Sequence, residues 1–232
     1  AALFAVWLIN NFSLEAGFTA SALFAFLAGF FALFLKIDYN KAYSKGFDFR
    51  NAQWISKHGL YPFLIFTSQT LTFGAIIAFL PSISQARDLG NPGIFYTVLA
   101  LTMLVVRSLS GYLSDLIGRK LVIVPALICS TFALILIAFT QTQIILILAS
   151  IFYGIGFASV QVVGFATLID TTPVQYHGSG LATYTNAWDV GGLLGGLAIG
   201  ILIEFFNFTS AFIFCAFLPI FALFFLKKIK LD

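Results

Sequence analysis

Long runs of apolar residues dominate the chain, and short polar breaks separate them. A helix needs about 20 apolar residues to cross the hydrocarbon core of a bilayer, and several of the runs reach that length. The pattern predicts a partial span over 1–9 and then seven full membrane-spanning helices, so an all-α integral membrane protein is expected. The short connections between most of them predict antiparallel neighbours. The expected full spans are 14–35, 59–80, 93–113, 121–140, 144–168, 179–203 and 209–226.

Basic residues divide unequally between the two sides that this alternation defines. One side carries ten Lys and Arg residues, the other carries only Arg87, and Arg107 falls within a span. Because Lys and Arg concentrate in cytoplasmic loops, we expect a multi-pass protein of the cell (inner or plasma) membrane with its C-terminus in the cytoplasm. The ten residues are Lys36, Lys41, Lys45, Arg50, Lys57, Arg119, Lys120, Lys227, Lys228 and Lys230.

The composition argues against several classes of function. Charged residues make up 9% of the 232 residues, whereas soluble domains usually carry about 25%. The basic residues lie between apolar runs, so no nucleic-acid partner is expected. Cys129 and Cys215 lie inside apolar runs without ligand spacing, which predicts neither a metal site nor a disulfide. No nucleophile–base–acid set or phosphate loop is present, so neither an enzyme nor a cofactor is expected.

An internal repeat suggests how the chain is organised. Residues 8–12 and Phe18 match residues 202–206 and Phe212 at the same spacing, and each copy ends in lysine. Two copies of one helix–turn–helix ending, six spans apart, are typical of transporters built from repeats. On this hypothesis 1–35 is the end of an N-terminal half whose other helices are missing, comprising the outer end of helix 5 and helix 6. The cytoplasmic central loop is 36–58, and 59–232 is a six-helix C-terminal half, helices 7–12.

The most specific motif is R-S-L-S-G-Y-L-S-D-L-I-G-R-K over 107–120. It resembles the signature loop of the major facilitator superfamily, G-x-L-[SA]-D-x-x-G-R-[KR]. Asp115 can accept hydrogen bonds from a helix N-terminus or an Arg, with Arg107 and Arg119 as the candidates. A tight, positively flanked turn without a moving part is the alternative. The expected gating motif is Arg107, Gly111, Asp115, Gly118, Arg119 and Lys120, where Gly111 admits a neighbouring backbone and Gly118 supplies a turn.

A second stretch, running from Tyr153-Gly154-Ile155-Gly156 through 170–173 and 177–180 to 186–192, resembles helices ten and eleven of the drug and metabolite efflux branch of that superfamily. The resemblance implies a secondary transporter of small molecules. Protons are the expected coupling ion, and efflux by antiport is the expected activity. Substrate would bind between two six-helix halves that rock about it. The alternative is a truncated or structural membrane protein that does not transport.

Polar residues inside the spans are the candidates for contacts with substrate and protons. Asp189 lies near the middle of its span, where a charge is expensive and usually faces the protein interior or water. The others are Gln69, Gln161, Tyr153, Tyr184 and Asn186. The alternative is that Asp189 forms helix–helix hydrogen bonds and that the neighbouring hydroxyls bond to their own helices.

Glycine and proline punctuate the expected spans. In the span 179–203, Gly191 with Gly195 and Gly196 with Gly200 are pairs four residues apart, which permit close helix contact. Pro81 falls near an expected span end, where a missing N–H costs little. Pro125 and Pro219 fall inside spans, where they should kink or soften the helix.

The charge distribution gives a testable topology. Cysteines that replace Lys45 or Lys120 should react with an impermeant thiol reagent only from the cytoplasmic side, and one that replaces Arg87 only from outside. Sealed vesicles of both orientations provide the measurement. Labelling of positions 45 and 87 from the same side would contradict the span count.

Overall fold

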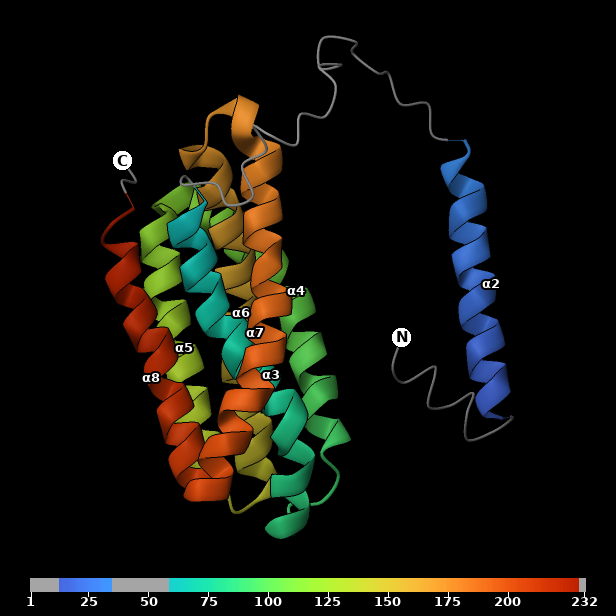
Figure 1. Ribbon diagram of the computed structural model, residues 1–232, viewed down its shortest axis with the longest axis vertical. Helices are drawn as coiled ribbons and strands as arrows, with labels where there is room; N and C mark the ends of the chain where they lie inside the picture. The colour runs from blue at the N-terminus through green and yellow to red at the C-terminus, as the bar shows by residue number, and fades with distance from the viewer. Residues whose placement is uncertain (1–12, 35–58, 230–232) are drawn as a thin grey trace. The chain divides into compact units, whose positions relative to one another are not determined.

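The computed structural model describes residues 13–34 and 59–229, which form seven α-helices and one short 3-10 helix, with no strand among them (Figure 1). The chain divides into two compact units, Ala1–Ala52 and Gln53–Asp232. The described helix of the first unit is α2 (Leu14–Ala32). The second unit contains α3 (Leu60–Ala86), α4 (Gly93–Ile117), α5 (Arg119–Phe139), α6 (Gln143–Thr171), η2 (Val174–Tyr176), α7 (His177–Phe205) and α8 (Phe208–Leu226).

The predicted full spans all appear as helices, so the all-α expectation is confirmed. The six helices α3 to α8 are each long and apolar enough to cross a membrane. Such helices satisfy most of their backbone N–H and C=O groups within the segment, as lipid requires. The partial span 1–9 and the loop 36–58 lie outside the described residues.

The expected end of α3 was wrong. The helix continues beyond residue 80 to Ala86 and contains Pro81, which was expected near a span end. A proline removes one N–H from the ladder but leaves the following bonds available. Beyond it the Arg87 N–H still bonds to the Ile83 carbonyl at 3.0 Å. Pro125 and Pro219 lie inside α5 and α8, as predicted.

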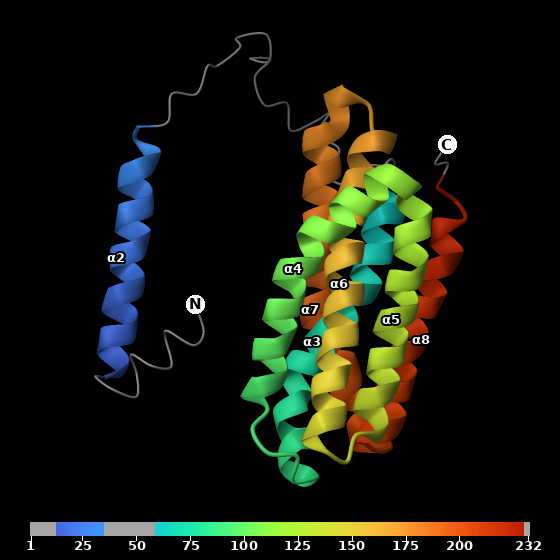
Figure 2. The same cartoon turned by 180° about the vertical axis from the view of Figure 1, so that it is seen from behind.

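The six helices of the second unit run alternately up and down (Figure 1). The starts of α3, α5 and α7 lie at the same end as the last turns of α4, α6 and α8, as the opposite view in Figure 2 also shows. We call this end the Arg119 end. Packing does not follow chain order, because α3 lies mainly on α7, α6 on both α4 and α5, and α5 on α8.

The contact between α3 and α7 depends on glycine. A Cβ at Gly195 would overlap the Leu71 carbonyl oxygen, and one at Gly191 would overlap Thr70. From the other side, a Cβ at Gly74 would lie 2.7 Å from the Gly192 carbonyl oxygen. The Thr70 hydroxyl donates to the Ala187 carbonyl at 2.6 Å. The two backbones therefore touch, and the predicted close packing of the Gly191–Gly195 face is confirmed.

Arg87, the single basic residue on its expected side, is used in a helix cap. Its guanidinium donates to the carbonyls of Ile137, Ala138 and Thr140, at 3.4, 3.0 and 2.9 Å, and to the Thr209 hydroxyl at 2.8 Å. These carbonyls lie in the last turn of α5 and just beyond it, where most carbonyls lack a partner in the helix, and the Ile137 carbonyl also accepts the Thr140 N–H at 3.3 Å. Arg87 thus joins the ends of α3 and α5 to the start of α8, which explains a cation on the otherwise poorly charged side.

Two helices of the second unit, α4 and α7, are the least covered. Only 17% of the most apolar window of each is buried, compared with 39% in α8 and 56% in α3, α5 and α6. Both α4 and α7 contact α6. The unit therefore has a face on which α4 and α7 are largely open and α6 lies beneath them.

The glycine contact predicts opposite effects at neighbouring positions. Gly195→Ala should lower the free energy of unfolding by about 1–3 kcal/mol, because the new methyl group cannot fit against Leu71 without separating α3 from α7. Gly192→Ala is the matched control, since a Cβ there meets nothing within 4 Å. It should be neutral or stabilise by up to about 1 kcal/mol. Unfolding in mixed micelles, followed by circular dichroism, measures both, and equal effects would contradict the tight contact.

Candidate functional site

Gly118 makes the turn between α4 and α5. It ends one helix and precedes the next with φ 97° and ψ 150°. A Cβ there would meet nothing within 4 Å, so space alone does not require glycine. The positive φ does require glycine, because other residues rarely adopt this backbone conformation. This turn places the first residue of α5, Arg119, beside the last turns of α4.

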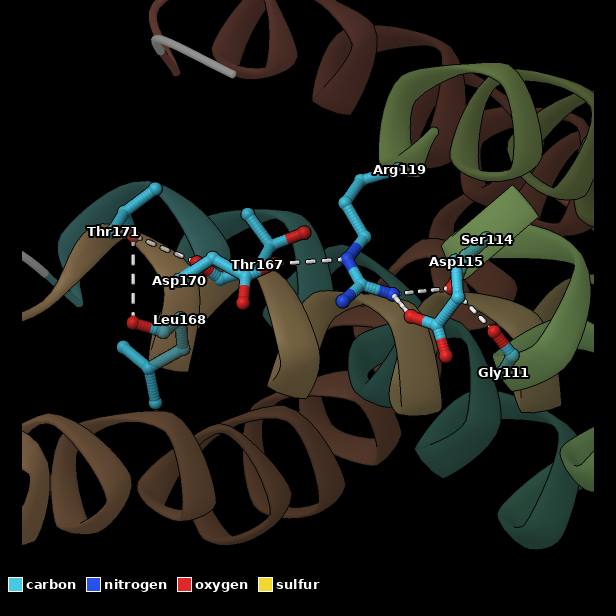
Figure 3. Close-up of polar contacts among 8 residues, drawn as sticks. All are labelled: Gly111, Ser114, Asp115, Arg119, Thr167, Leu168, Asp170 and Thr171. Carbon is cyan, nitrogen blue, oxygen red and sulfur yellow. Dashed lines mark hydrogen bonds and ion pairs between the residues drawn. The ribbon is translucent and has the colours of Figure 1, made fainter. Parts of the chain in front are cut away.

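Arg119 joins the ends of three helices at the Arg119 end. Its Nη1 donates to Asp115 Oδ1 at 2.5 Å and to Ser114 Oγ at 2.6 Å (Figure 3). Its Nε donates to Asp170 Oδ2, near the end of α6, at 2.9 Å. Asp115 and Asp170 are exposed, with 65% and 48% of their side-chain surface accessible. Exposed ion pairs are worth about 0–1 kcal/mol each, so this bridge orients the helix ends and opens at small cost.

Two expectations about the motif were wrong. Arg107 does not contact Asp115 but donates to Gln161 Oε1 at 2.9 Å, because it lies two helical turns earlier on α4. Gly111 does not admit a neighbouring backbone, since the nearest group to a Cβ there is the Val162 side chain at an ordinary 3.5 Å. Lys120 is half-buried near the start of α5.

A pocket of about 370 Å³ lies on the face formed by α4, α6 and α7. This volume is within the range of small-molecule sites. Arg107 and Gln161 each stand ten residues before the end of their helix, and Trp188 stands eleven after the start of α7. At 1.5 Å per residue the pocket is about 15–17 Å from the Arg119 end, roughly halfway along the helices. The lining residues are Arg107 from α4, Gln161, Val162 and Phe165 from α6, and Tyr184, Thr185 and Trp188 from α7.

The aromatic wall of the pocket is held in place from behind. Phe66 of α3 stacks on Tyr184 with ring centroids 4.8 Å apart and meets Trp188 edge to face at 5.6 Å. The Tyr184 hydroxyl donates to the Gln161 carbonyl at 2.8 Å. Phe165 meets the Tyr184 ring at 6.1 Å. The Tyr184 ring is therefore held by packing and a hydrogen bond, and the Trp188 ring packs against Phe66.

Gln69 and Tyr153 belong to the interior and not to the pocket. Both are fully buried. The Ser130 hydroxyl donates to Gln69 Oε1 at 2.9 Å, and the Tyr153 hydroxyl donates to the Gln69 carbonyl at 3.1 Å and lies 2.8 Å from the Thr72 hydroxyl. These bonds join α3, α5 and α6. The alternative that hydroxyls bond to their own helix is also seen, since Thr67 donates to the Phe63 carbonyl.

Asp189 and Asn186 are exposed on α7. Asp189 stands twelve residues after His177, the first residue of α7, which is about 18 Å along the helix. Neither residue lines the pocket. Of the sequence candidates, the structure thus brings Arg107, Gln161 and Tyr184 together, and it places Asp189 one turn beyond the lining residue Thr185.

The sequence candidates did not include Asp170, Phe165 or Trp188. Asp170 has a signal, because it closes a span on the same expected side as Arg119 and has the opposite charge. Phe165 has none, since a chain with 29 Phe does not distinguish a pocket ring from a lipid-facing one, whereas Trp188 lies within the 186–192 stretch that resembles the efflux branch. Within 13–34 and 59–229, no group of three or more His, Cys, Asp or Glu side chains is placed to hold a metal ion.

Comparisons with known proteins agree with this architecture. The family model described as Major Facilitator Superfamily matches residues 62–230. Relatives named "Putative multidrug resistance protein MdtD", from Yersinia pestis (strain Pestoides F) and Yersinia pseudotuberculosis (serotype O:1b, strain IP 31758), are 34% identical over 164 residues. The alignment covers 69% of this chain and 34% of each relative. The chain thus spans about a third of their length, and their name confirms the expected resemblance to the drug efflux branch.

Proposed function

Since the chain belongs to the Major Facilitator Superfamily, we propose that it forms part of a secondary transporter that exports small organic molecules by alternating access. The observation that carries the proposal is the pocket among α4, α6 and α7, which lies about halfway along the helices. Substrate sites of such carriers lie near the bilayer midplane. The name of the Yersinia relatives supports efflux of drug-like molecules.

We further propose that α3 to α8 are the C-terminal half of the transporter and that α2 belongs to the end of the first half. The low burial of α4 and α7 supports this proposal, because their open face carries the pocket and the charges of Arg107 and Asp189. Lipid cannot satisfy those charges, whereas a second half or water between the halves can. The Arg119 end would then be cytoplasmic, since it carries Arg119, Lys120, Lys227 and Lys228.

The proposed role of Arg119 is to hold the cytoplasmic ends of α4, α5 and α6 together in one state of the cycle. A gate must be stable enough to close and weak enough to open on each turnover. The bridge suits that task because its carboxylates are exposed and each pair contributes little. Asp189 is the proposed proton site, since it is a carboxylate at mid-depth within a turn of the pocket.

Drug efflux with and without a pH gradient tests the function and the proton site together. The chain would be joined behind the part of the Yersinia pestis relative that precedes the aligned region and produced in a bacterium without its own multidrug pumps. The fusion should lower drug accumulation, and an ionophore that collapses the pH gradient should abolish the effect. The 232-residue chain alone should insert without lowering accumulation.

In the same assay Asp189→Asn should still bind drug but lose its response to the gradient, while Asp189→Glu should retain part of it. A fusion that inserts and folds but exports no drug of a broad panel would contradict the proposed function. Full gradient dependence in Asp189→Asn would instead show that the proton is carried elsewhere.

The gate gives a separate prediction. Asp115→Asn and Asp170→Asn keep the side-chain shape but remove the charge opposite Arg119, and each should lower transport up to about fivefold at equal expression. Asp88→Asn is the control, because Asp88 is exposed at the opposite end and its φ of 49° suits asparagine equally well. Transport rates normalised to membrane protein are the measurement. Unchanged rates in both Asp115 and Asp170 variants would exclude the gate.

A further inference from the structure

We propose that the pocket among α4, α6 and α7 selects organic anions with a flat apolar body, such as aromatic carboxylates, and that the guanidinium of Arg107 recognises the anionic group. The inference rests on the proposed function only in treating this pocket as the substrate site. Its evidence is the charge, the hydrogen-bond donors and the shape of the lining.

Arg107 brings a positive charge to mid-membrane that its neighbours do not neutralise. Its hydrogen-bond partner is the side-chain amide oxygen of Gln161, which carries no net charge. The ion pairs found within 13–34 and 59–229 both belong to Arg119. An arginine cannot shed its proton in a protein, so its charge persists. A charge at this depth is costly, and an anionic ligand would neutralise it.

The free donors of the pocket suit a carboxylate. A guanidinium has five N–H donors in a planar fork that matches two carboxylate oxygens. The bond from Arg107 Nη2 to Gln161 leaves other donors of that fork for a ligand. None of the seven lining residues is acidic, so nothing within the lining repels an anion. Gln161 acts as a positioning residue, because it holds the guanidinium without cancelling its charge.

The rest of the lining suits a flat apolar body. Phe165, Tyr184 and Trp188 present aromatic rings, and the Tyr184 hydroxyl already donates to a backbone carbonyl. Phe66 stacks behind Tyr184 with an angle of 11° between the ring planes. Aromatic ligands pack well on such rings, and walls fixed in advance lose little entropy on binding.

Asp189 is the residue that could give the site the opposite charge preference. It lies one turn beyond Thr185 on α7 and is exposed, outside the lining. If the Asp189 carboxylate set the charge preference of the site, cations and not anions would bind. Three ligands of one shape separate these cases: 2-naphthoate, which is an anion at pH 7, the neutral naphthalene-2-carboxamide, and the cation 2-naphthylmethylammonium.

The test measures binding of these three probes to the 232-residue chain in nanodiscs, with each variant first shown to be folded by circular dichroism and gel filtration. We expect saturable 2-naphthoate binding at least about tenfold tighter than that of the amide or the cation. Arg107→Gln should remove this preference and leave amide binding within about threefold. Arg107→Lys should retain part of it, because lysine keeps the charge but loses the fork. Gln161→Leu should weaken the binding of 2-naphthoate while the preference for it over the amide persists. Lys228→Gln, which is distant from the pocket, is the control.

A folded chain that binds no 2-naphthoate at millimolar concentration, binds the three probes equally, or prefers the cation would overturn the inference. An unchanged preference in folded Arg107→Gln would also do so. Failure of the proposed function is distinguishable, because Arg107-dependent anion binding without drug export in the fusion would leave the site standing as an anion site. Export of neutral or cationic drugs with no Arg107-dependent binding would support the proposed function and contradict the anion preference.

Discussion

The absence of hydrogen-bonding solvent in the bilayer is the constraint on which the rest of this structure depends. It explains why the second unit consists of apolar helices that satisfy their own backbones. Most buried hydroxyls follow the same rule, as when Ser68 donates to the Ile65 carbonyl and Thr131 to the Leu127 carbonyl. Polar groups that depart from it need a specific partner. Arg87 has one in the carbonyls at the end of α5 and Arg107 has one in Gln161, whereas Asp189 is exposed on α7.

Contacts between the helices fall into two energetic kinds. The α3–α7 contact is backbone against backbone at Gly191 and Gly195, and it leaves no space for a side chain to rearrange. Cores of this kind move as rigid bodies because any separation loses many close contacts at once. The Arg119 bridge is exposed and individually weak. Motion within the proposed transport cycle is therefore expected at the helix ends and not inside the α3–α7 pair.

The sequence predicted those features of the structure that depend on span length and local chemistry. Span length predicted the helices, and the motif predicted both the turn at Gly118 and an arginine partner for Asp115. It could not predict the packing order, because helices that are apolar on all sides give no sign of which face meets which neighbour. Gln69 and Gln161 are the same residue in similar runs, yet one is interior and the other lines the pocket. Only the rotation of each helix about its own axis distinguishes them.

Two observations concern the same pair of helices, α4 and α7. The burial of the helices leaves α4 and α7 open within the second unit, an outcome of packing that does not involve charge. Arg107 and Asp189, charged residues near the middle of these helices, are exposed on the same two helices. A face turned to lipid would carry neither charge at this depth without a large penalty. We therefore expect the open side of α4 and α7, where the pocket lies, to face water, ligand or protein.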